Sequence, residues 1–170
     1  AYSVTVSNAA GTAAATAAAL SVNPVSRISN LSIRTQVGAA TGPLTVGLTI
    51  GGASTTGTKP LLLRAVGPTL AAFGVGDALA DPQLAILSGS TAIAENDDWS
   101  GNAAVAATNA AVGAFGFASV TSKDAALAHA ADSGGYTVRI TGAGTSSGVA
   151  LAEVYDASPG DTFFISTPRL

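Results

Sequence analysis

The segment 59–88, KPLLLRAVGPTLAAFGVGDALADPQLAILS, constrains the fold more than any other part of the chain. It opens with the apolar run 61–66, which is typical of a strand, breaks at Gly67-Pro68, and resumes a strand-like apolar run at 83–87. Two strands of this kind need neighbouring strands on either side. The segment therefore indicates a protein built from β-sheets.

The overall composition supports this expectation and excludes two classes of partner. Only 10% of the residues are charged and 5% are aromatic, whereas glycine occurs 20 times, a balance that favours strands and tight turns over a helical bundle. The net charge of −3 argues against nucleic-acid or anionic-membrane partners, which need clustered Lys and Arg. The chain has no cysteine, so disulfides and thiolate chemistry are excluded.

Alternating apolar and polar residues predict further strands. The pattern is clear at 44–50 and in a C-terminal hairpin whose strands are 136–141 and 149–155. The alanine-rich segment 102–114 is the best helix candidate, and a single helical turn is expected near 124–131.

We expect an all-β domain at 25–158, a β-sandwich or jelly-roll-like fold with one or two short helices. Strand-like extensions flank it. Residues 1–24 read as a hairpin with its turn at 8–11, a return strand at 18–22 and the boundary signal Asn23-Pro24 at its end, and 159–170 contain a hydrophobic terminal strand.

Two parts of the chain resemble modules of large bacterial proteins. The stretch YSVTVSNAAGTAAATAAALSV resembles the last two strands of a bacterial immunoglobulin-like domain, with Val4 at the position of the usual cysteine. Residues 26–156 resemble a β-rich module that recurs in large secreted bacterial proteins, often beside immunoglobulin-like repeats. That likeness is carried by SRISNLSIRTQVG, LLLRAVGPTLAAFGVGDALADPQLAIL, ENDDW and GGYTVRITGAGTSSGVALAEVYD. Such modules are generally of unknown biochemical function.

The familiar catalytic motifs do not fit. Residues 52–59 approach a phosphate-binding loop, but the lysine falls one position late and a strand follows where a helix must begin, so we interpret them as a turn. His129 is the only histidine and is expected at the surface, so a metal cluster built from several histidines is excluded. We expect no catalytic site.

One acidic segment is a candidate calcium site. Glu95, Asn96, Asp97 and Asp98 concentrate oxygen ligands, which Ca²⁺ prefers. The alternative is an Asx-type turn whose carboxylates are solvated or cap the following helix. No other cofactor is expected. Trp99 is expected to be a core anchor, with a sugar-stacking platform as the alternative.

Glu153 conflicts with a simple inside-outside pattern because it shares a strand face with Val149 and Leu151. Pairing with Arg139 would resolve the conflict. Alternatively, the core would be formed by the opposite face, which carries Ala150, Ala152 and Val154.

These features predict a non-catalytic subunit of an extracellular filament or surface assembly, polymerised head to tail by β-strand donation. The alternative is a spacer or a glycan- or protein-binding module of a large secreted adhesin or enzyme. The expected partners are other copies of the chain or neighbouring domains, with no membrane span. The expected assembly residues are Tyr2, Val4, Val6, Leu20, Val22, Phe163, Phe164 and Ile165.

Overall fold

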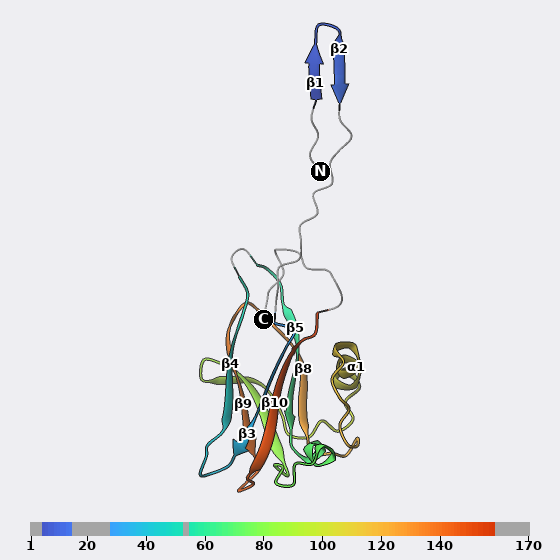
Figure 1. The fold of residues 1–170 in the computed structure, drawn as a ribbon. Coiled ribbons are helices and arrows are strands. Elements are labelled where there is room, and N and C mark those ends of the chain that lie inside the picture. The colour runs from blue at the N-terminus through green and yellow to red at the C-terminus, as the bar shows by residue number, and fades with distance from the viewer. Residues whose placement is uncertain (1–4, 15–27, 53–54, 159–170) are drawn as a thin grey trace.

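A computed structural model describes residues 5–14, 28–52 and 55–158. Two four-stranded antiparallel sheets pack face to face, with strand orders β3-β10-β5-β8 and β4-β9-β6-β7 (Figure 1). The expectation of an all-β sandwich with short helices is confirmed. The first sheet contains β3 (Asn30–Val37), β5 (Lys59–Val66), β8 (Ala125–Ala131) and β10 (Gly148–Asp156), and the second contains β4 (Leu44–Ile50), β6 (Pro82–Ser88), β7 (Thr91–Asn96) and β9 (Gly134–Gly142).

The core lies between the two sheets and is made of aliphatic side chains on alternate strand positions. Small residues on β10 face branched residues on the other strands, so the sheets approach closely without large aromatic side chains. The buried core includes Leu61, Leu63 and Ala65 of β5, Ala150, Ala152 and Val154 of β10, Leu84 and Ile86 of β6, Val138 and Ile140 of β9, and Val46 and Ile50 of β4.

The helical turn expected near 124–131 is wrong, because this segment forms β8. Its sequence AALAHAA favours a helix by intrinsic propensity, but all seven residues pair with β5. Ala125, Ala126 and Ala131 are buried. Sheet pairing and burial therefore override the local preference of alanine.

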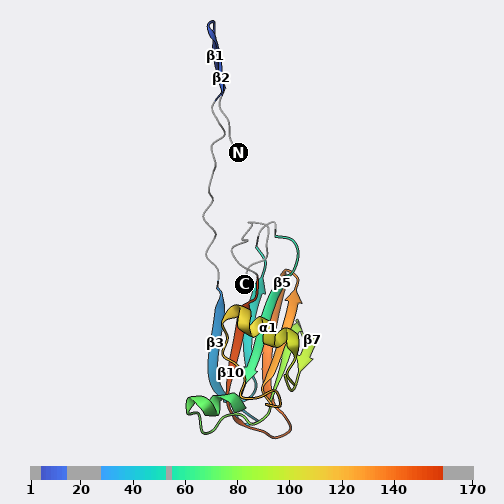
Figure 2. The same cartoon turned by 90° about the vertical axis from the view of Figure 1, so that its right-hand side faces the viewer.

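The expected helix is confirmed as α1 (Ala103–Val112). The Asn102 side chain caps its first turn by accepting hydrogen bonds from the backbone N–H groups of Ala104 (3.0 Å) and Val105 (3.1 Å). Gly113, with φ 71°, ends it in a left-handed conformation. The helix lies in front of the β3-β10-β5-β8 sheet in Figure 2 and covers part of its outer face.

The Gly67-Pro68 break leads into a short 3₁₀ helix, η1 (Pro68–Phe73), at one end of the sandwich. After it, Ala78 forms an isolated parallel bridge with Val149 at the start of β10. Val149 N–H donates to the Asp77 carbonyl and Leu79 N–H donates to the Val149 carbonyl, both at 2.8 Å. The bridge buries Leu79 completely and closes this end of the core.

The N-terminal hairpin consists of β1 (Thr5–Asn8) and β2 (Gly11–Ala14), joined by the turn predicted from the sequence. Asn8 Oδ1 accepts hydrogen bonds from the N–H groups of Ala10 (2.8 Å) and Gly11 (3.2 Å). All of its described residues are exposed, and it is drawn apart from the sandwich in Figures 1 and 2. The return strand expected at 18–22 and the terminal strand at 159–170 lie outside the described residues.

No helix within the described ranges is both long and apolar enough to cross a membrane.

The close approach at Gly148 gives a stability prediction. A Cβ added at Gly148 would lie 2.6 Å from Leu79 N and 2.7 Å from the Asp77 carbonyl oxygen. Gly148→Ala should therefore lower the free energy of unfolding by about 1–3 kcal/mol, measured by urea denaturation. Gly47→Ala is the matched strand control, since no atom lies within 4 Å of its new Cβ, and should change stability by less than about 1 kcal/mol. Equal effects of the two substitutions would contradict the prediction.

Candidate functional site

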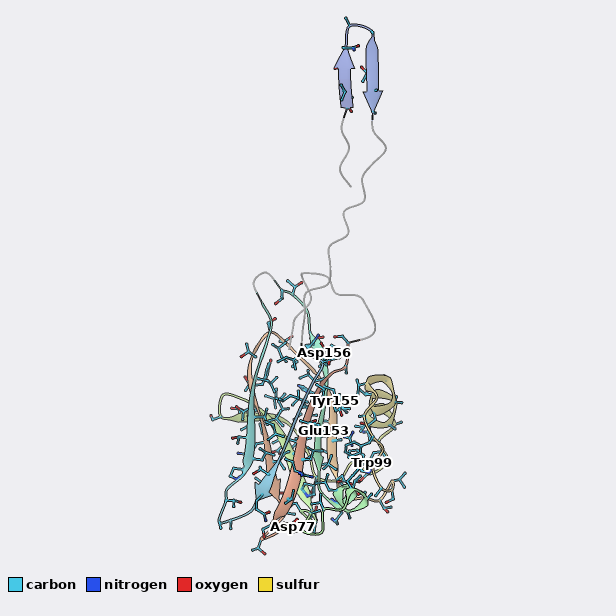
Figure 3. The ribbon with its side chains drawn as sticks, in the orientation of Figure 1. Asp77, Trp99, Glu153, Tyr155 and Asp156 are labelled. Carbon is cyan, nitrogen blue, oxygen red and sulfur yellow. The ribbon has the colours of Figure 1, made fainter. Side chains whose placement is uncertain are left out.

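A buried pair of opposite charges lies on the outer face of the first sheet. Arg64 on β5 is in register with Glu153 on β10, and Arg64 Nε lies 3.4 Å from Glu153 Oε2. The Arg64 side chain is fully buried and that of Glu153 is 5% exposed. Glu153 Oε1 also accepts hydrogen bonds from the hydroxyls of Tyr155 (2.8 Å) and Ser32 (3.3 Å). Figure 3 labels Glu153 and Tyr155 on β10.

This arrangement settles the conflict around Glu153. The opposite face of β10, with Ala150, Ala152 and Val154, is the core face, as one of the two alternatives proposed. The alternative pairing with Arg139 is wrong, because Arg139 lies on β9 of the other sheet. Arg64 is the partner of Glu153. The sequence feature that could have indicated this is the position of Arg64 as the single charged residue in the apolar run 61–66.

Aromatic side chains from the segment after α1 cover the guanidinium. Arg64 Cζ lies 4.3 Å from the ring centroid of Phe115 and 4.4 Å from that of Phe117, which are cation–π distances. Burial lowers the pKa of Arg64, while the charge of Glu153 acts in the opposite direction. Burial, reinforced by the hydrogen bond to Glu153, raises the pKa of Tyr155 to about 12.

A second buried carboxylate, Asp124, joins the loop before β8 to η1. Its Oδ1 accepts hydrogen bonds from Gly67 N (2.7 Å) and Thr69 N (3.3 Å). Its Oδ2 accepts from the Thr69 hydroxyl (2.5 Å) and from the Ser122 hydroxyl. Four donors at one buried carboxylate fix two loops to each other, which is a structural arrangement.

A second buried charge pair occupies the opposite end of the sandwich, near Asp156 in Figure 3. Lys59 Nζ lies 2.5 Å from Asp156 Oδ2 and donates to Ser158 Oγ at 3.0 Å. Lys59 belongs to a strand and its ammonium is buried in this pair. It is therefore not placed to bind a phosphate, in agreement with the interpretation of 52–59 as a turn.

The structure separates the four residues of the acidic segment. Asn96 is occupied by the fold, because its Oδ1 accepts from Ala126 N (2.8 Å) and its Nδ2 donates to the Asp98 carbonyl (3.0 Å). Asp98 Oδ1 lies 3.7 Å from Lys123 Nζ. Glu95 and Asp97 line a groove on the second sheet. In the described part of the chain, no group of three or more His, Cys, Asp or Glu is placed to hold a metal ion, and calcium binding stays a prediction.

The groove lies on the outer face of β9, β6 and β7 and has a volume of about 310 Å³. Its floor is Ala85, which pairs with Arg139 on one side and with Glu95 on the other. Adjacent strands are about 4.8 Å apart, so the backbones of Arg139 and Glu95 are roughly 10 Å apart, with a small residue between them. Gln83, Thr141 and Asp97 extend the same polar surface.

Burial decides between the interpretations of Trp99, and His129 lies on β8. Trp99 is 8% exposed, its Nε1 donates to the Ser119 carbonyl at 2.9 Å, and its ring lies 5.0 Å from that of Phe117. The expectation of a core anchor is confirmed, and the sugar-platform alternative is wrong. His129 is half-buried on β8 opposite Leu61, beside a small-residue groove between β8 and α1.

Of the expected assembly residues, Val6 is described. It lies on β1 and is 65% exposed. Tyr2, Val4, Leu20, Val22, Phe163, Phe164 and Ile165 lie outside the described residues.

No protein-family model matches the chain, and no curated protein or solved structure matches it either.

The buried pair predicts a specific stability pattern. Glu153→Leu leaves the Arg64 guanidinium buried without its counter-charge and should cost about 3–5 kcal/mol in urea denaturation. The double substitution Arg64→Met, Glu153→Leu removes both charges and should recover most of that loss. A single substitution that costs less than about 1 kcal/mol would contradict the assigned pairing.

The raised pKa of Tyr155 makes the stability of the fold depend on pH. Its pKa is about 12 in the folded protein, against an ordinary value of 10.0, so the unfolded chain releases this proton first as the pH rises. The resulting stabilisation is complete below pH 10 and declines towards pH 12. Relative to Tyr155→Phe, the wild type should lose stability across that window in urea denaturation at stepped pH, and a constant difference would contradict the prediction.

Proposed function

We propose that the protein is a non-catalytic structural subunit of an extracellular filament or surface assembly whose copies join head to tail by β-strand donation. The observation that carries the proposal is the β1–β2 hairpin, which is fully exposed and pairs only with itself within the described residues. An isolated two-stranded hairpin is marginally stable in water, so this element gains stability from a further strand.

The composition and the sandwich support the same role. The low charge and the abundance of Ser, Thr, Gly and Ala without cysteine are typical of bacterial surface and secreted proteins. The three buried carboxylates of the sandwich, Asp124, Glu153 and Asp156, contact buried or partly buried partners within the fold. Donation from one copy to the next, without closure into a ring, produces a filament.

The groove on the second sheet favours a second candidate function, a binding module for a glycan or protein. Arg139 and Glu95 on either side of Ala85 provide donors and acceptors on an exposed sheet face. Under this alternative the isolated chain remains a monomer and binds its ligand through the groove. Arg139→Ala would then abolish binding to a glycan or peptide panel without changing the state of assembly.

The test of the filament uses purified full-length chain, light scattering and negative-stain electron microscopy. We expect regular filaments from the full chain and monomers from a version that lacks residues 1–24. Val6→Lys should also prevent assembly, because Val6 and Ala13 form the apolar side of the hairpin. Ser7→Lys adds the same charge on the polar side and should assemble normally. If the full chain and the truncated chain are both monodisperse monomers, the filament proposal fails.

A further inference from the structure

The edge of the first sheet at β3 has a free row of backbone hydrogen-bonding groups. β3 pairs with β10 alone among the described strands. Asp156 N–H donates to the Ser29 carbonyl at 3.0 Å, and Tyr155 is opposite Asn30, which sets the alternation of the ladder. The odd-numbered residues therefore bond towards β10. The N–H and C=O groups of Asn30, Ser32, Arg34 and Gln36 point away from the sheet.

The side chains of β3 alternate between an apolar and a polar face. Leu31 and Ile33 are in register with Val154 and Ala152, whose side chains lie in the core. Leu31 is nevertheless 37% exposed and Ile33 is only half-buried, because the sheet ends at this strand. The opposite face is polar and carries Asn30, Ser32, Arg34 and Gln36.

The other three sheet edges are better protected. β7 is shorter, with six residues, and its pairing with β6 contains a register shift. β8 is tied across to β7, since Asn96 Oδ1 accepts from Ala126 N at 2.8 Å. On β4 most inward apolar residues are covered, since Leu44, Val46 and Ile50 are buried and Leu48 is half-buried. By contrast, β3 is the longest of the four edge strands, with eight residues, and its inward residue Leu31 is exposed, which makes it the best template for an added strand.

The hairpin has the same two-faced character. Val6 pairs with Ala13 on one side, and Ser7 pairs with Thr12 on the other. If β1 aligns beside β3, the apolar side of the hairpin continues the row of Leu31 and Ile33. Its polar side then continues the row of Ser32 and Arg34. One placement thus matches both faces and pairs with part of the free backbone row, since β1 has four residues and β3 has eight.

We propose that the β1–β2 hairpin of a second copy of this chain docks through β1 on the free edge of β3 and extends the first sheet from four strands to six. This inference rests on the proposed filament and names its acceptor. The contact joins the N-terminal hairpin of one copy to the sandwich of the next, so the repeating contact is heterologous.

Two lysine substitutions on adjacent residues of β3 test the acceptor. In the full chain, Leu31→Lys places a charge on the face that docking buries and should raise the concentration needed for assembly at least about tenfold. Asn30→Lys places it on the solvent face and should assemble like the wild type. Circular dichroism and thermal melting check that both variants are folded. Assembly of Leu31→Lys at the wild-type concentration, or equal loss in both variants, would overturn the proposal.

Cysteine cross-linking tests the contact without relying on assembly strength, because the chain has no native cysteine. Full-length Val6→Cys is mixed under mild oxidation with a second variant that carries one cysteine on β3. The inward positions are Leu31, Ile33 and Thr35, and the outward positions are Ser32 and Arg34. We expect disulfide-linked dimers with at least one of the three inward positions and none with the two outward positions. Cross-links only to outward positions, or none at all, would overturn the proposal.

The failures of the two proposals are distinguishable. A wild-type chain that does not assemble contradicts the filament. If the wild type and the Leu31→Lys variant both assemble and no inward cross-link forms, the filament proposal stands. β3 is then excluded as the acceptor.

Discussion

The pairing of β5 with β10 determines how the rest of the sandwich is arranged. Two buried ion pairs hold these strands, and they lie on opposite faces: Arg64 with Glu153 outside, and Lys59 with Asp156 on the core side. A register slip of one residue would turn the Arg64 guanidinium into the aliphatic core and expose Leu63. Desolvation of these buried charges lowers the stability of the fold. It raises the free energy of the alternative registers much more, because there the charges would be buried without their partners.

The same ion pair explains why the two sheets differ on their outer faces. Arg64 and Glu153 must be shielded from water, and the chain between β7 and β8 provides that cover with α1, Trp99 and the two phenylalanines at 115 and 117. No described helix covers the outer face of the second sheet, which keeps its polar groove. Surface that remains accessible for recognition is therefore concentrated on the second sheet and at the β3 edge.

Local patterns were sufficient where a segment could be interpreted without its neighbours. The alternation from Tyr136 to Tyr155 identified the last hairpin, and Asn102 and Gly113 bracket a helix that the alanine content predicted. β8 could not be found this way, since its alanines prefer a helix until they are placed against β5. The partner of Glu153 was hidden for a similar reason: Arg64 is far away in sequence and becomes adjacent only when the last strand enters the first sheet.

The position of β10 also affects when the chain can fold. β10 is the last described strand, yet it lies between β3 and β5, so β3 has no strand partner until β10 is present. Synthesis from the N-terminus therefore produces most of the sandwich before its central strand exists. Long-range pairing of this kind is slow to form. The first sheet therefore closes only after the chain has been synthesised to residue 156, and until then β3 and β5 lack the strand that joins them.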